Sequence, residues 1–512
     1  MNCRAVKVAQ FYGIDINDFA IKVLKICFLL AELQLSGEIL DISALDKNII
    51  TANALRRDWN KLLPNKKCSY IISNPPFAGK KSKEQLKDMK ICFNDTNIKS
   101  GTLDYVTCWY KKSSDYIKNT GIECCFLSTN STVQGTQPAI LWKYLLEDKG
   151  IFINFAYKSF KWENKTTEKV AQVFVVIIGF SYKERPKKFL YSVSKNNNFE
   201  SEPVNYINGY LTKGKCFYIN NLKLPLDDRE RMFNGIAYVD NGIYKLSLKE
   251  KLSLVEKEPF SEEYIHPYFN GRDLLDNKTN FCLWFQNKNL FNLKKCPTIM
   301  KKIKKVMEYR LKCGQDTKKY SDKPLKPARL RYYSNKILEK LLVFSGTFSS
   351  QYEYIPAKYV LKGSIVTNSI MLIPNASKFT FGIIESKVHM FWAKRFAGRL
   401  KDDISYSNGT VYNTFPWPNP TKKQKENIEK TAKMILDARK LYPKCTLAQL
   451  YDPLTMPPEL RKAHKLNDEA VFKAYGFSKN ITEEECVAKL MKMYKVLVEK
   501  ESLENQTKKE SL

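Results

Sequence analysis

The sequence predicts an α/β fold built on an open sheet, followed by a second region of different character. Through the first 180 residues, apolar runs of strand length alternate with longer segments of helical periodicity. A short apolar strand at 69–72 leads directly into the stiff tetrapeptide Asn74-Pro75-Pro76-Phe77. From about residue 186 the pattern changes to short strands and loops, and helices return after about residue 420. These observations indicate a doubly wound domain, a mixed second domain and a helical end.

Size and charge narrow the class of protein. The chain has 512 residues, enough for two or three domains, and its 44% hydrophobic and 13% aromatic content is typical of a packed globular protein. Lys and Arg number 85 against 53 Asp and Glu, a formal net charge of +32. Such an excess favours a polyanionic partner, nucleic acid above all. The alternative is a generally lysine-rich composition.

The cysteines and histidines predict no metal site. None of the 13 cysteines forms a C-x-x-C pair, and there are only three histidines. Scattered thiols among apolar residues are typical of a reduced, intracellular protein. The apolar run 173–180 is too short to span a bilayer, and no signal peptide is visible. The predicted location is therefore cytoplasmic.

The first strand and helix carry a candidate binding residue. Residues 11–16 read as a strand that ends in Asp15, and Asn17 or Asp18 is placed to cap a helix that runs to about Leu35. Doubly wound folds use an acid at such a strand end to hold ribose hydroxyls. A helix-capping acid is the alternative reading of Asp15. Residues 49–55 read as the next strand and turn, in which Asn53 is either a contact to an adenine edge or a simple turn asparagine.

The tetrapeptide at 74–77 stands where an open parallel sheet performs its chemistry, beyond the carboxyl end of a strand. Two prolines stiffen this loop and remove two backbone donors. What remains is rich in acceptors, namely the side-chain carbonyl of Asn74 and the backbone carbonyl of Pro75. Two neighbouring acceptors suit an exocyclic amino group, which has two N–H donors. Hydrogen bonds from both N–H groups keep the lone pair on nitrogen available for attack on an electrophile.

Phe77 adds a flat ring on which a base can stack. A base inside a duplex is out of reach, so the loop implies a flipped nucleotide. The alternative is a Pro-Pro turn that merely ends a strand. The motif resembles the catalytic motif of amino-group methyltransferases, of which the DNA adenine-N6 enzymes are the largest class.

The remaining segments of the first region continue the alternation. A helix is predicted at 101–117, a strand at 123–127 with the polar turn 128–131, a helix within 132–149, and strands at 151–157 and 170–180. We expect a parallel, three-layered sheet that closes with a hairpin at its edge.

The second region is predicted to follow a polar linker at 183–201, with strands at 281–285, 341–345 and 365–373. Between residues 294 and 340 there are sixteen Lys and Arg against four Asp and Glu, with tyrosines interleaved. Such a segment is typical of phosphate contacts with some base contacts, and a solvated face is the alternative. The predicted DNA-binding residues are Lys301, Lys302, Lys304, Lys305, Arg310, Arg329 and Arg331.

The end of the chain is predicted to be helical. A helix at 386–398 contains His389, which we interpret as a packed residue, and Pro416 and Pro418 mark a domain edge. Further helices are expected at 422–441 and 482–500, the second opening with a Thr482–Glu485 capping box. The predicted domains are therefore 1–185, 186–420 and 421–512.

Over nearly all of its length the chain resembles the methyltransferase and target-recognition portion of the MmeI-like type II restriction–modification enzymes. The stretches that carry the resemblance run in family order and include FYGIDINDFA (11–20), TANALRRDW (51–59), IISNPPFAGKK (71–81), GTLDYVTCWY (101–110), FLSTNSTVQG (126–135), FKWEN (160–164), IHPYFNGRDLL (265–275), FGIIESKVHMFWAKRFAGRL (381–400) and LAQLYDPLTMPPELRKAHKLNDEAV (447–471).

The resemblance implies a Rossmann-like class I methyltransferase sheet, a mixed α+β target-recognition domain and a C-terminal helical region. It implies S-adenosylmethionine as methyl donor and adenine N6 in duplex DNA as acceptor. The matching positions are Asn74, Pro75, Pro76 and Phe77 for the catalytic motif, Asp15 for the ribose-binding acid and Asn53 for the position beside the cofactor's adenine. Ile16 and Ala54 are further cofactor-binding residues implied by the resemblance.

The sequence also departs from the family pattern. The family's methyltransferase domain opens with a strand and a glycine-rich loop that receives the methionine moiety, and a nuclease domain precedes it in many relatives. Here Met1 stands just short of the second strand. The departure implies a methyltransferase sheet without its first strand, to be completed by an N-terminal chain, and weak binding of S-adenosylmethionine by this chain alone.

Two other functions stay open from the sequence. One is a DNA-binding specificity module without catalysis, favoured by the departure above and opposed by the intact Asn-Pro-Pro-Phe. The other is methylation of RNA or of a protein glutamine, which the basic second region disfavours.

Overall fold

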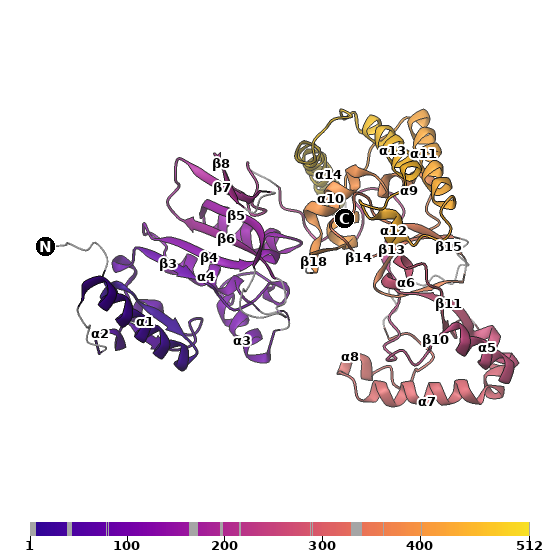
Figure 1. The fold of residues 1–512 in the computed structure, drawn as a ribbon, viewed down its shortest axis with the longest axis horizontal. Coiled ribbons are helices and arrows are strands. Elements are labelled where there is room, and N and C mark those ends of the chain that lie inside the picture. Colours follow the sequence, from indigo (N-terminus) through magenta and orange to yellow (C-terminus); the bar gives the residue numbers. More distant parts are fainter. Residues whose placement is uncertain are drawn as a thin grey trace. The chain divides into compact units, whose positions relative to one another are not determined.

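The structure is a computed structural model and describes residues 7–510 except 38–42, 78, 80, 163–172, 195–197, 215–216, 287, 289, 329–339, 362 and 401. The chain divides into two compact units, Met1–Tyr218 and Ile219–Leu512, and each is described by itself (Figure 1).

The first unit begins with a two-stranded parallel sheet in which β1 pairs with β2. Its elements are η1 (Val8–Gln10), β1 (Gly13–Asp15), α1 (Asp18–Ser36), α2 (Ser43–Asp46), β2 (Ile49–Thr51), η2 (Trp59–Lys61) and η3 (Asn65–Lys67). Asn17 caps α1, because its side chain accepts from the backbone N–H groups of Phe19 and Ala20, as predicted. A small core of Val8, Ile21, Leu45 and Ile49 holds this part together.

The main sheet of the first unit has six strands in the order β3-β4-β6-β5-β7-β8 (Figure 1). Its elements are β3 (Tyr70–Ser73), α3 (Lys83–Cys92), η4 (Ser100–Thr102), α4 (Thr107–Tyr116), β4 (Glu123–Thr129), η5 (Asn130–Val133), η6 (Pro138–Trp142), η7 (Tyr144–Asp148), β5 (Phe152–Trp162), β6 (Val173–Ser181), β7 (Lys188–Val193) and β8 (Phe199–Val204). The sheet is mixed: β3 runs parallel to β4 and β5 parallel to β7, whereas the other pairs are antiparallel.

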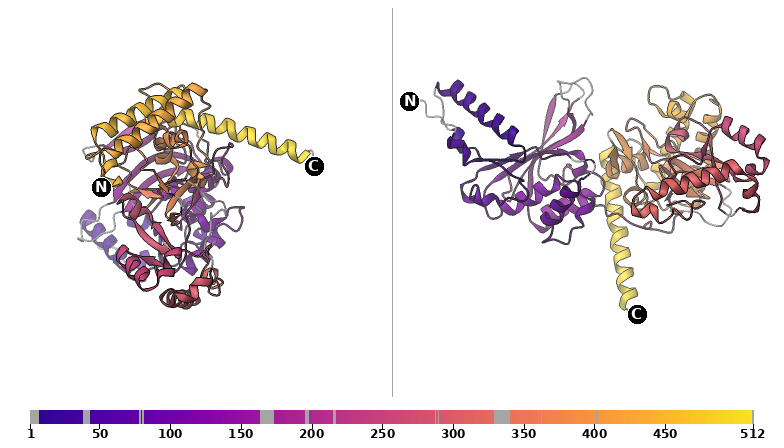
Figure 2. Two further views of the ribbon diagram at one scale, coloured as in Figure 1. Left: turned by 90° about the vertical axis from the view of Figure 1, so that its right-hand side faces the viewer. Right: turned by 90° about the horizontal axis from the view of Figure 1, so that it is seen from below.

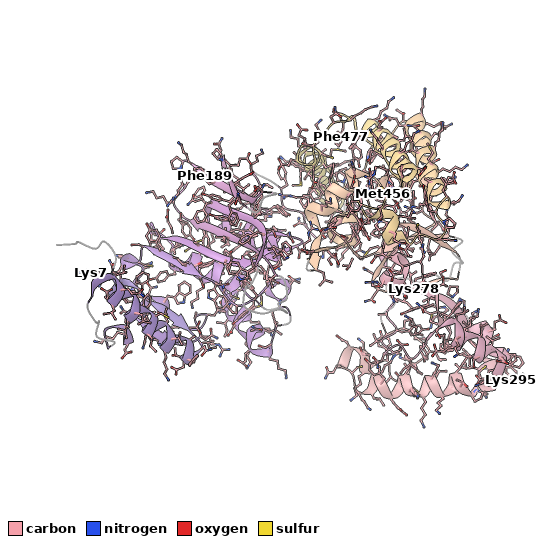
Figure 3. The ribbon with its side chains drawn as sticks, in the orientation of Figure 1. Lys7, Phe189, Lys278, Lys295, Met456 and Phe477 are labelled. Carbon is pink, nitrogen blue, oxygen red and sulfur yellow. The ribbon has the colours of Figure 1, made fainter. Side chains whose placement is uncertain are left out.

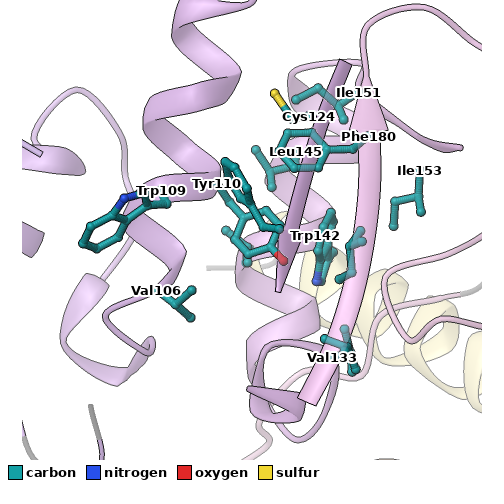
Figure 4. Close-up of a cluster of buried hydrophobic side chains, with 14 of the residues drawn as sticks. Val106, Trp109, Tyr110, Cys124, Val133, Trp142, Leu145, Ile151, Ile153 and Phe180 are labelled. Carbon is teal, nitrogen blue, oxygen red and sulfur yellow. The ribbon is translucent and has the colours of Figure 1, made fainter. Parts of the chain in front are cut away.

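An aromatic cluster fills the core of this sheet (Figure 4). Tyr110 of α4 meets the edges of Phe126 and Trp142 with ring centroids 5.2 Å apart, the geometry that aromatic pairs prefer. Trp142 lies on the π-helical turn η6, and its indole N–H donates to the carbonyl of Thr132. The helix predicted at 132–149 is therefore built of the short turns η5, η6 and η7.

The polar segment 183–201 is not a linker, so that prediction is wrong. Its described residues include β7, which pairs with β5, and most of β8, which pairs with β7. Lys188 is buried because its ammonium donates to the Glu184 carboxylate and to the carbonyl of Asn205. This segment therefore belongs to the first compact unit, which runs to Tyr218.

The second unit contains three small sheets, in the orders β10-β12-β11-β16, β15-β13-β17-β9 and β14-β19-β18. Its elements up to residue 419 are β9 (Phe233–Asn234), β10 (Lys245–Leu246), α5 (Leu248–Lys257), η8 (Pro259–Tyr264), β11 (Ile265–Phe269), α6 (Gly271–Leu275), β12 (Asn280–Leu283), η9 (Phe291–Lys295), α7 (Pro297–Leu311), α8 (Gln315–Lys318), β13 (Lys340–Ser345), β14 (Thr347–Phe348), β15 (Lys358–Leu361), β16 (Ile365–Val366), β17 (Ile370–Pro374), α9 (Lys378–Ile384), α10 (Lys387–Phe396), β18 (Gly398–Leu400), β19 (Asp403–Ser405) and η10 (Asn408–Tyr412). Strands are present at the predicted positions 281–285 and 341–345, but the strand predicted at 365–373 is divided into β16 and β17, which belong to different sheets. The helix α7 lies where strands and loops were expected.

The C-terminal helices are α11 (Lys422–Lys440), α12 (Leu447–Tyr451), α13 (Pro458–Tyr475) and α14 (Glu483–Glu510). Helices α11 and α13 lie side by side and pack on α9 (Figure 1). The sequence analysis did not predict α13. The Thr482–Glu485 capping box of α14 is confirmed, since each residue's side chain accepts from the other's backbone N–H. Figure 2 shows the end of α14 extending beyond the other helices of this unit.

A buried ionic cluster joins these helices to the preceding domain. Glu385, between α9 and α10, is fully buried and accepts from Arg439 of α11 and from the Tyr451 hydroxyl. Arg439 also donates to the carbonyl of Ala357 at 2.6 Å. Burial raises the pKa of the Glu385 carboxyl, while Arg439 opposes that shift. The pair therefore depends on both partners, because either charge left alone here would be buried without compensation.

Two kinds of feature are absent from the described residues. None of the helices there is long and apolar enough to cross a membrane. No group of three or more His, Cys, Asp or Glu side chains in the same part of the chain is arranged to hold a metal ion.

Candidate functional site

The loop Asn74-Pro75-Pro76-Phe77 leaves the sheet at the carboxyl end of β3. Pro75 is buried, which anchors the loop, whereas Asn74 is exposed and the ring of Phe77 is 37% exposed. Ser73 pairs in parallel register with Phe126, so the loop and the polar turn after β4 emerge at the same edge of the sheet. The carboxamide of Asn74 and the face of Phe77 are thus accessible to a ligand, as the sequence predicts for a base-binding loop.

The exit from this loop is fixed by short-range contacts. The ammonium of Lys81 donates to the carbonyl of Leu103 at 2.6 Å. Ser82 then caps α3 in a capping box with Gln85. On the neighbouring turn, the carboxylate of Asp104 accepts from the hydroxyls of Thr129 and Ser131. Lys81 and Ser82 therefore hold the chain where it leaves the loop.

Asp15 stands at the carboxyl end of β1 with its side chain exposed. One carboxylate oxygen accepts from the backbone N–H of Asn17 at 2.8 Å, and the backbone carbonyl accepts from Ala52 N–H at 2.8 Å. Asn17, and not Asp15, provides the helix cap. The neighbouring Ile16 is 73% exposed and presents an apolar surface beside the carboxylate.

Asn53 lies in the turn after β2, and its side chain is engaged within the protein. Its amide N–H donates to Asp88 at 3.2 Å, and its side-chain oxygen accepts from the backbone N–H of Leu55 at 2.9 Å. Ala54 is half-buried and accepts from the indole of Trp59. The interpretation of Asn53 as a turn asparagine therefore describes its side-chain contacts within the protein.

Asp88 is the site residue that sequence reasoning missed. It is buried on α3, and its carboxylate accepts from Asn53, Arg56 and Tyr105. Burial works against ionisation, but the hydrogen bonds from Tyr105 and Arg56 outweigh it, and the pKa of the Asp88 carboxyl is lowered. Nothing in the sequence marks this residue, because an acid in a lysine-rich helix normally faces solvent.

The predicted DNA-binding lysines of the second unit differ in their exposure to solvent. Lys301, Lys304 and Lys305 are exposed on α7, whose N-terminal end lies just beyond Lys295 in Figure 3. Lys302 is half-buried and donates to the carbonyl of Ile243 at 2.8 Å, and burial lowers the pKa of its ammonium. Of the predicted DNA-binding residues that the structure describes, Lys301, Lys304 and Lys305 are therefore the exposed ones.

The prediction that Arg310 contacts DNA is corrected by the structure. The side chain is fully buried, and its guanidinium donates to backbone carbonyls of Tyr238, Val239, Tyr320 and Lys323. A guanidinium that donates its hydrogen bonds to internal carbonyls has a structural role, because it holds together the segments that carry those carbonyls. Arg329 and Arg331 lie outside the described residues.

His389 is a packed residue, as predicted. It is fully buried, its Nε2 lies 2.9 Å from the Tyr406 hydroxyl, and its ring meets the edge of Phe415. Burial lowers the pKa of the imidazole to about 3, so the ring is neutral at physiological pH. A catalytic base at this position is therefore not supported.

Three family models match the chain in succession. They are described as the MmeI DNA-methyltransferase domain over residues 2–192, the MmeI target recognition domain over 213–419 and the MmeI C-terminal domain over 420–501. The first model contains Asp15, Asn53 and the loop 74–77, and the second contains α7.

Two relatives agree with these models. DNA methyltransferase A of Bacillus subtilis (strain 168) is 33% identical over 514 residues, which cover 97% of this chain and 57% of that protein. The solved structure of the type IIL restriction–modification enzyme MmeI in complex with DNA matches with a TM-score of 0.88 and 35% identity, over 96% of this chain and 67% of that chain. The present chain thus spans little more than half the length of the curated relative.

The three consecutive family matches agree with the shared fold and with the exposed Asn-Pro-Pro-Phe loop at the edge of the sheet. The chain therefore belongs to the MmeI family and comprises the methyltransferase, target recognition and C-terminal domains of that family.

Proposed function

We propose that this chain is a site-specific DNA methyltransferase that transfers a methyl group from S-adenosylmethionine to adenine N6 in duplex DNA, as part of a restriction–modification system. The observation that carries the proposal is the accessible Asn74-Pro75-Pro76-Phe77 loop at the carboxyl end of β3. Because the proposed substrate is DNA, we also propose the cytoplasm as its location.

The loop residues have distinct roles in this proposal. A target adenine, flipped out of the duplex, stacks on the face of Phe77. The side-chain carbonyl of Asn74 and the backbone carbonyl of Pro75 accept hydrogen bonds from the two N6–H groups. These hydrogen bonds keep the nitrogen lone pair directed at the methyl carbon. Pro76 stiffens the loop, so that little freedom is lost when the base is bound. Alignment of the reacting atoms supplies much of the acceleration.

The residues present fit one end of S-adenosylmethionine. The exposed carboxylate of Asp15 has an oxygen free of the Asn17 contact, which is suited to ribose hydroxyls, and exposed Ile16 offers an apolar contact for the adenine ring. Asn53 shapes the neighbouring turn, and Ala54 lies on it. When bound, the sulfonium supplies an already activated methyl group, so the chain needs no further electrophile.

The sheet edges support an additional partner segment. Within the described residues, β1 pairs only with β2, and β3 is the terminal strand of the main sheet. On β3, Tyr70 is 70% and Ile72 is 82% exposed. Unpaired parallel edges with exposed apolar side chains invite another strand. We propose that an additional polypeptide segment, such as the N-terminal chain implied by the family pattern, pairs here and completes the cofactor pocket.

This proposal predicts weak cofactor binding by the 512-residue chain alone. We expect isothermal titration with S-adenosylmethionine to give a Kd on the order of 1 mM or weaker, because Asp15 and Ile16 are proposed to hold only the ribose and adenine end of the cofactor. Addition of a complementing segment that contains the glycine-rich loop should strengthen binding at least about tenfold, or 1.4 kcal/mol. Micromolar binding by the chain alone would show that the pocket is already complete.

DNA is proposed to contact the second unit through α7. The solved MmeI relative is in complex with DNA, and the target recognition model covers Lys301, Lys304 and Lys305. These exposed lysines suit phosphate contacts, which fix the position of a protein on the duplex without reading sequence. A purely DNA-binding module is not favoured, because the methyltransferase model covers 2–192 and the loop at 74–77 is intact.

Salt dependence tests the lysines. In the full chain, replacing Lys301, Lys304 and Lys305 together by glutamine should flatten the slope of log Kobs against log salt by about 2 to 3, because each lost phosphate contact contributes about 0.9. The matched control replaces Lys422, Lys423 and Lys430, three exposed lysines of α11. An equal slope in the wild type and the α7 variant would make this part of α7 an ordinary solvated surface.

A further inference from the structure

Asp88 joins the two halves of the proposed site. Helix α3 begins at Lys83, six residues after the last residue of the proposed catalytic loop, and carries the buried residue Asp88. From the other direction, the Ala52–Arg56 turn leaves β2 next to Asp15, whose carbonyl accepts from Ala52 N–H at 2.8 Å. The carboxylate of Asp88 is the point where these two segments meet.

The two carboxylate oxygens of Asp88 accept hydrogen bonds from different donors. Oδ1 accepts from the Nε of Arg56 at 2.7 Å, while Oδ2 accepts from the Nδ2 of Asn53 at 3.2 Å and from the Tyr105 hydroxyl at 2.6 Å. The side chain is 3% exposed, so water does not compete strongly for these bonds. A buried carboxylate with three protein donors restrains their relative positions, because releasing Arg56 deprives buried Oδ1 of this donor, and releasing Tyr105 or Asn53 leaves Oδ2 with one of its two donors.

Asp88 accepts from two side chains of this turn, those of Asn53 and Arg56. Arg56 reaches a second acid of the same helix, Glu84, at 2.9 Å, but that carboxylate is largely exposed and contributes little. The ammonium of Lys112 donates to the carbonyl of Leu55 at 2.8 Å, at the far end of the turn. Asn53 itself has its other side-chain bond within the turn, to Leu55 N–H, so Asp88 is its link to the rest of the fold.

We infer that Asp88 is a positioning residue for methyl transfer: it holds the Ala52–Arg56 turn, which borders the proposed cofactor site, in register with the helix that follows the catalytic loop. This inference rests on the proposed function. Asp88 touches neither substrate nor cofactor in this scheme. Its contribution is to the geometry of the cofactor side, so its loss weakens use of S-adenosylmethionine more than binding of DNA.

Two variants distinguish a positioning role of Asp88 from a purely stabilising role. Asp88→Asn keeps the size of the side chain but turns one acceptor into a donor, so either the Asn53 amide or Arg56 faces another N–H group. Tyr105→Phe removes a single donor to Oδ2 and keeps the ring, which packs against Trp109. The matched control is Asp95→Asn, which breaks an ion pair with buried Lys111 in the same unit but has no contact with the turn.

Initial rates with tritiated S-adenosylmethionine and duplex DNA provide the readout, in whichever form of the enzyme the wild-type chain is active, alone or complemented. We expect Asp88→Asn to raise KM for S-adenosylmethionine about tenfold, and Tyr105→Phe about threefold, with kcat and KM for DNA within about twofold of wild type. Asp95→Asn should leave both KM values unchanged. Melting temperatures of all variants report any common loss of stability.

An unchanged KM for S-adenosylmethionine in Asp88→Asn, beside a lowered melting temperature, would reduce Asp88 to a structural residue and overturn the inference. Should Asp88→Asn not fold, an unchanged KM in Tyr105→Phe overturns it equally. A wild-type chain that transfers no methyl group in any form refutes the proposed function, and the inference falls with it. If the wild type transfers methyl groups and both Asp88→Asn and Tyr105→Phe keep its KM for S-adenosylmethionine, only the inference is refuted.

Discussion

Replacement of Asn74 by alanine is expected to abolish methyl transfer and to leave DNA binding nearly intact. The side-chain carbonyl of Asn74 is one of two acceptors proposed for the N6 amino group, and it is exposed at the carboxyl end of β3. Without it the adenine is neither held in line nor kept nucleophilic. Loss of one preplaced hydrogen-bonding group at a reacting centre costs about 100- to 1,000-fold in kcat. Transfer of tritium from S-adenosylmethionine to duplex DNA measures the effect.

The chain offers a matched control for this substitution. Asn94 is an exposed asparagine just after α3, in the same unit but away from the loop. Asn94→Ala should retain the wild-type rate. DNA affinity, measured by fluorescence anisotropy, should be the same for the wild type and both variants, because duplex contacts are assigned to the second unit. A wild-type rate in Asn74→Ala would remove the loop from the chemistry.

The second large effect is expected from Arg439→Met, which should destabilise the second unit by about 3 to 5 kcal/mol. The substitution leaves Glu385 fully buried without its cation, although the Tyr451 hydroxyl still donates to it. The contact between Arg439 and the carbonyl of Ala357 is lost as well. Urea unfolding of the full chain, followed by circular dichroism, measures the loss.

The pH dependence of this variant has a defined sign. Burial already raises the pKa of Glu385, and loss of Arg439 raises it further, so the folded variant takes up a proton more readily than the unfolded chain. Stability therefore falls as pH rises through the raised pKa. The deficit should be larger at pH 8 than at pH 5. Lys440→Met, an exposed neighbour on α11 that pairs with Asp437, is the control and should stay within about 0.5 kcal/mol of wild type. An equal small loss in both variants would mean that the buried cluster contributes little.

Local sequence signals predicted the features that depend on local geometry. The strand that ends at Ser73, the stiff loop after it, the Asn17 cap and the Thr482–Glu485 box are all set by residues within a few positions of one another. The candidate loop could be identified for the same reason, because its motif consists of four consecutive residues, 74–77.

The errors concern residues whose partners are distant in sequence. The segment 183–201 is polar, but β7 is stabilised by pairing with β5, some thirty residues earlier, and Lys188 is buried because Glu184 and the Asn205 carbonyl compensate its charge. Arg310 resembles its basic neighbours on α7, and only the carbonyls that surround it make it structural. Asp88 is inconspicuous in sequence because its three donors come from two other segments.

The identity of the methylated nucleoside tests the proposed reaction most directly. Duplex DNA of mixed sequence is incubated with S-adenosylmethionine and the chain, alone and with a complementing segment, then digested to nucleosides and analysed by mass spectrometry. We predict N6-methyladenine as the product, and its absence when the chain carries Asn74→Ala. N4-methylcytosine or 5-methylcytosine in its place, or no methylated nucleoside with either form of the wild-type chain, would contradict the assignment of adenine N6 as the acceptor held by Asn74 and Pro75.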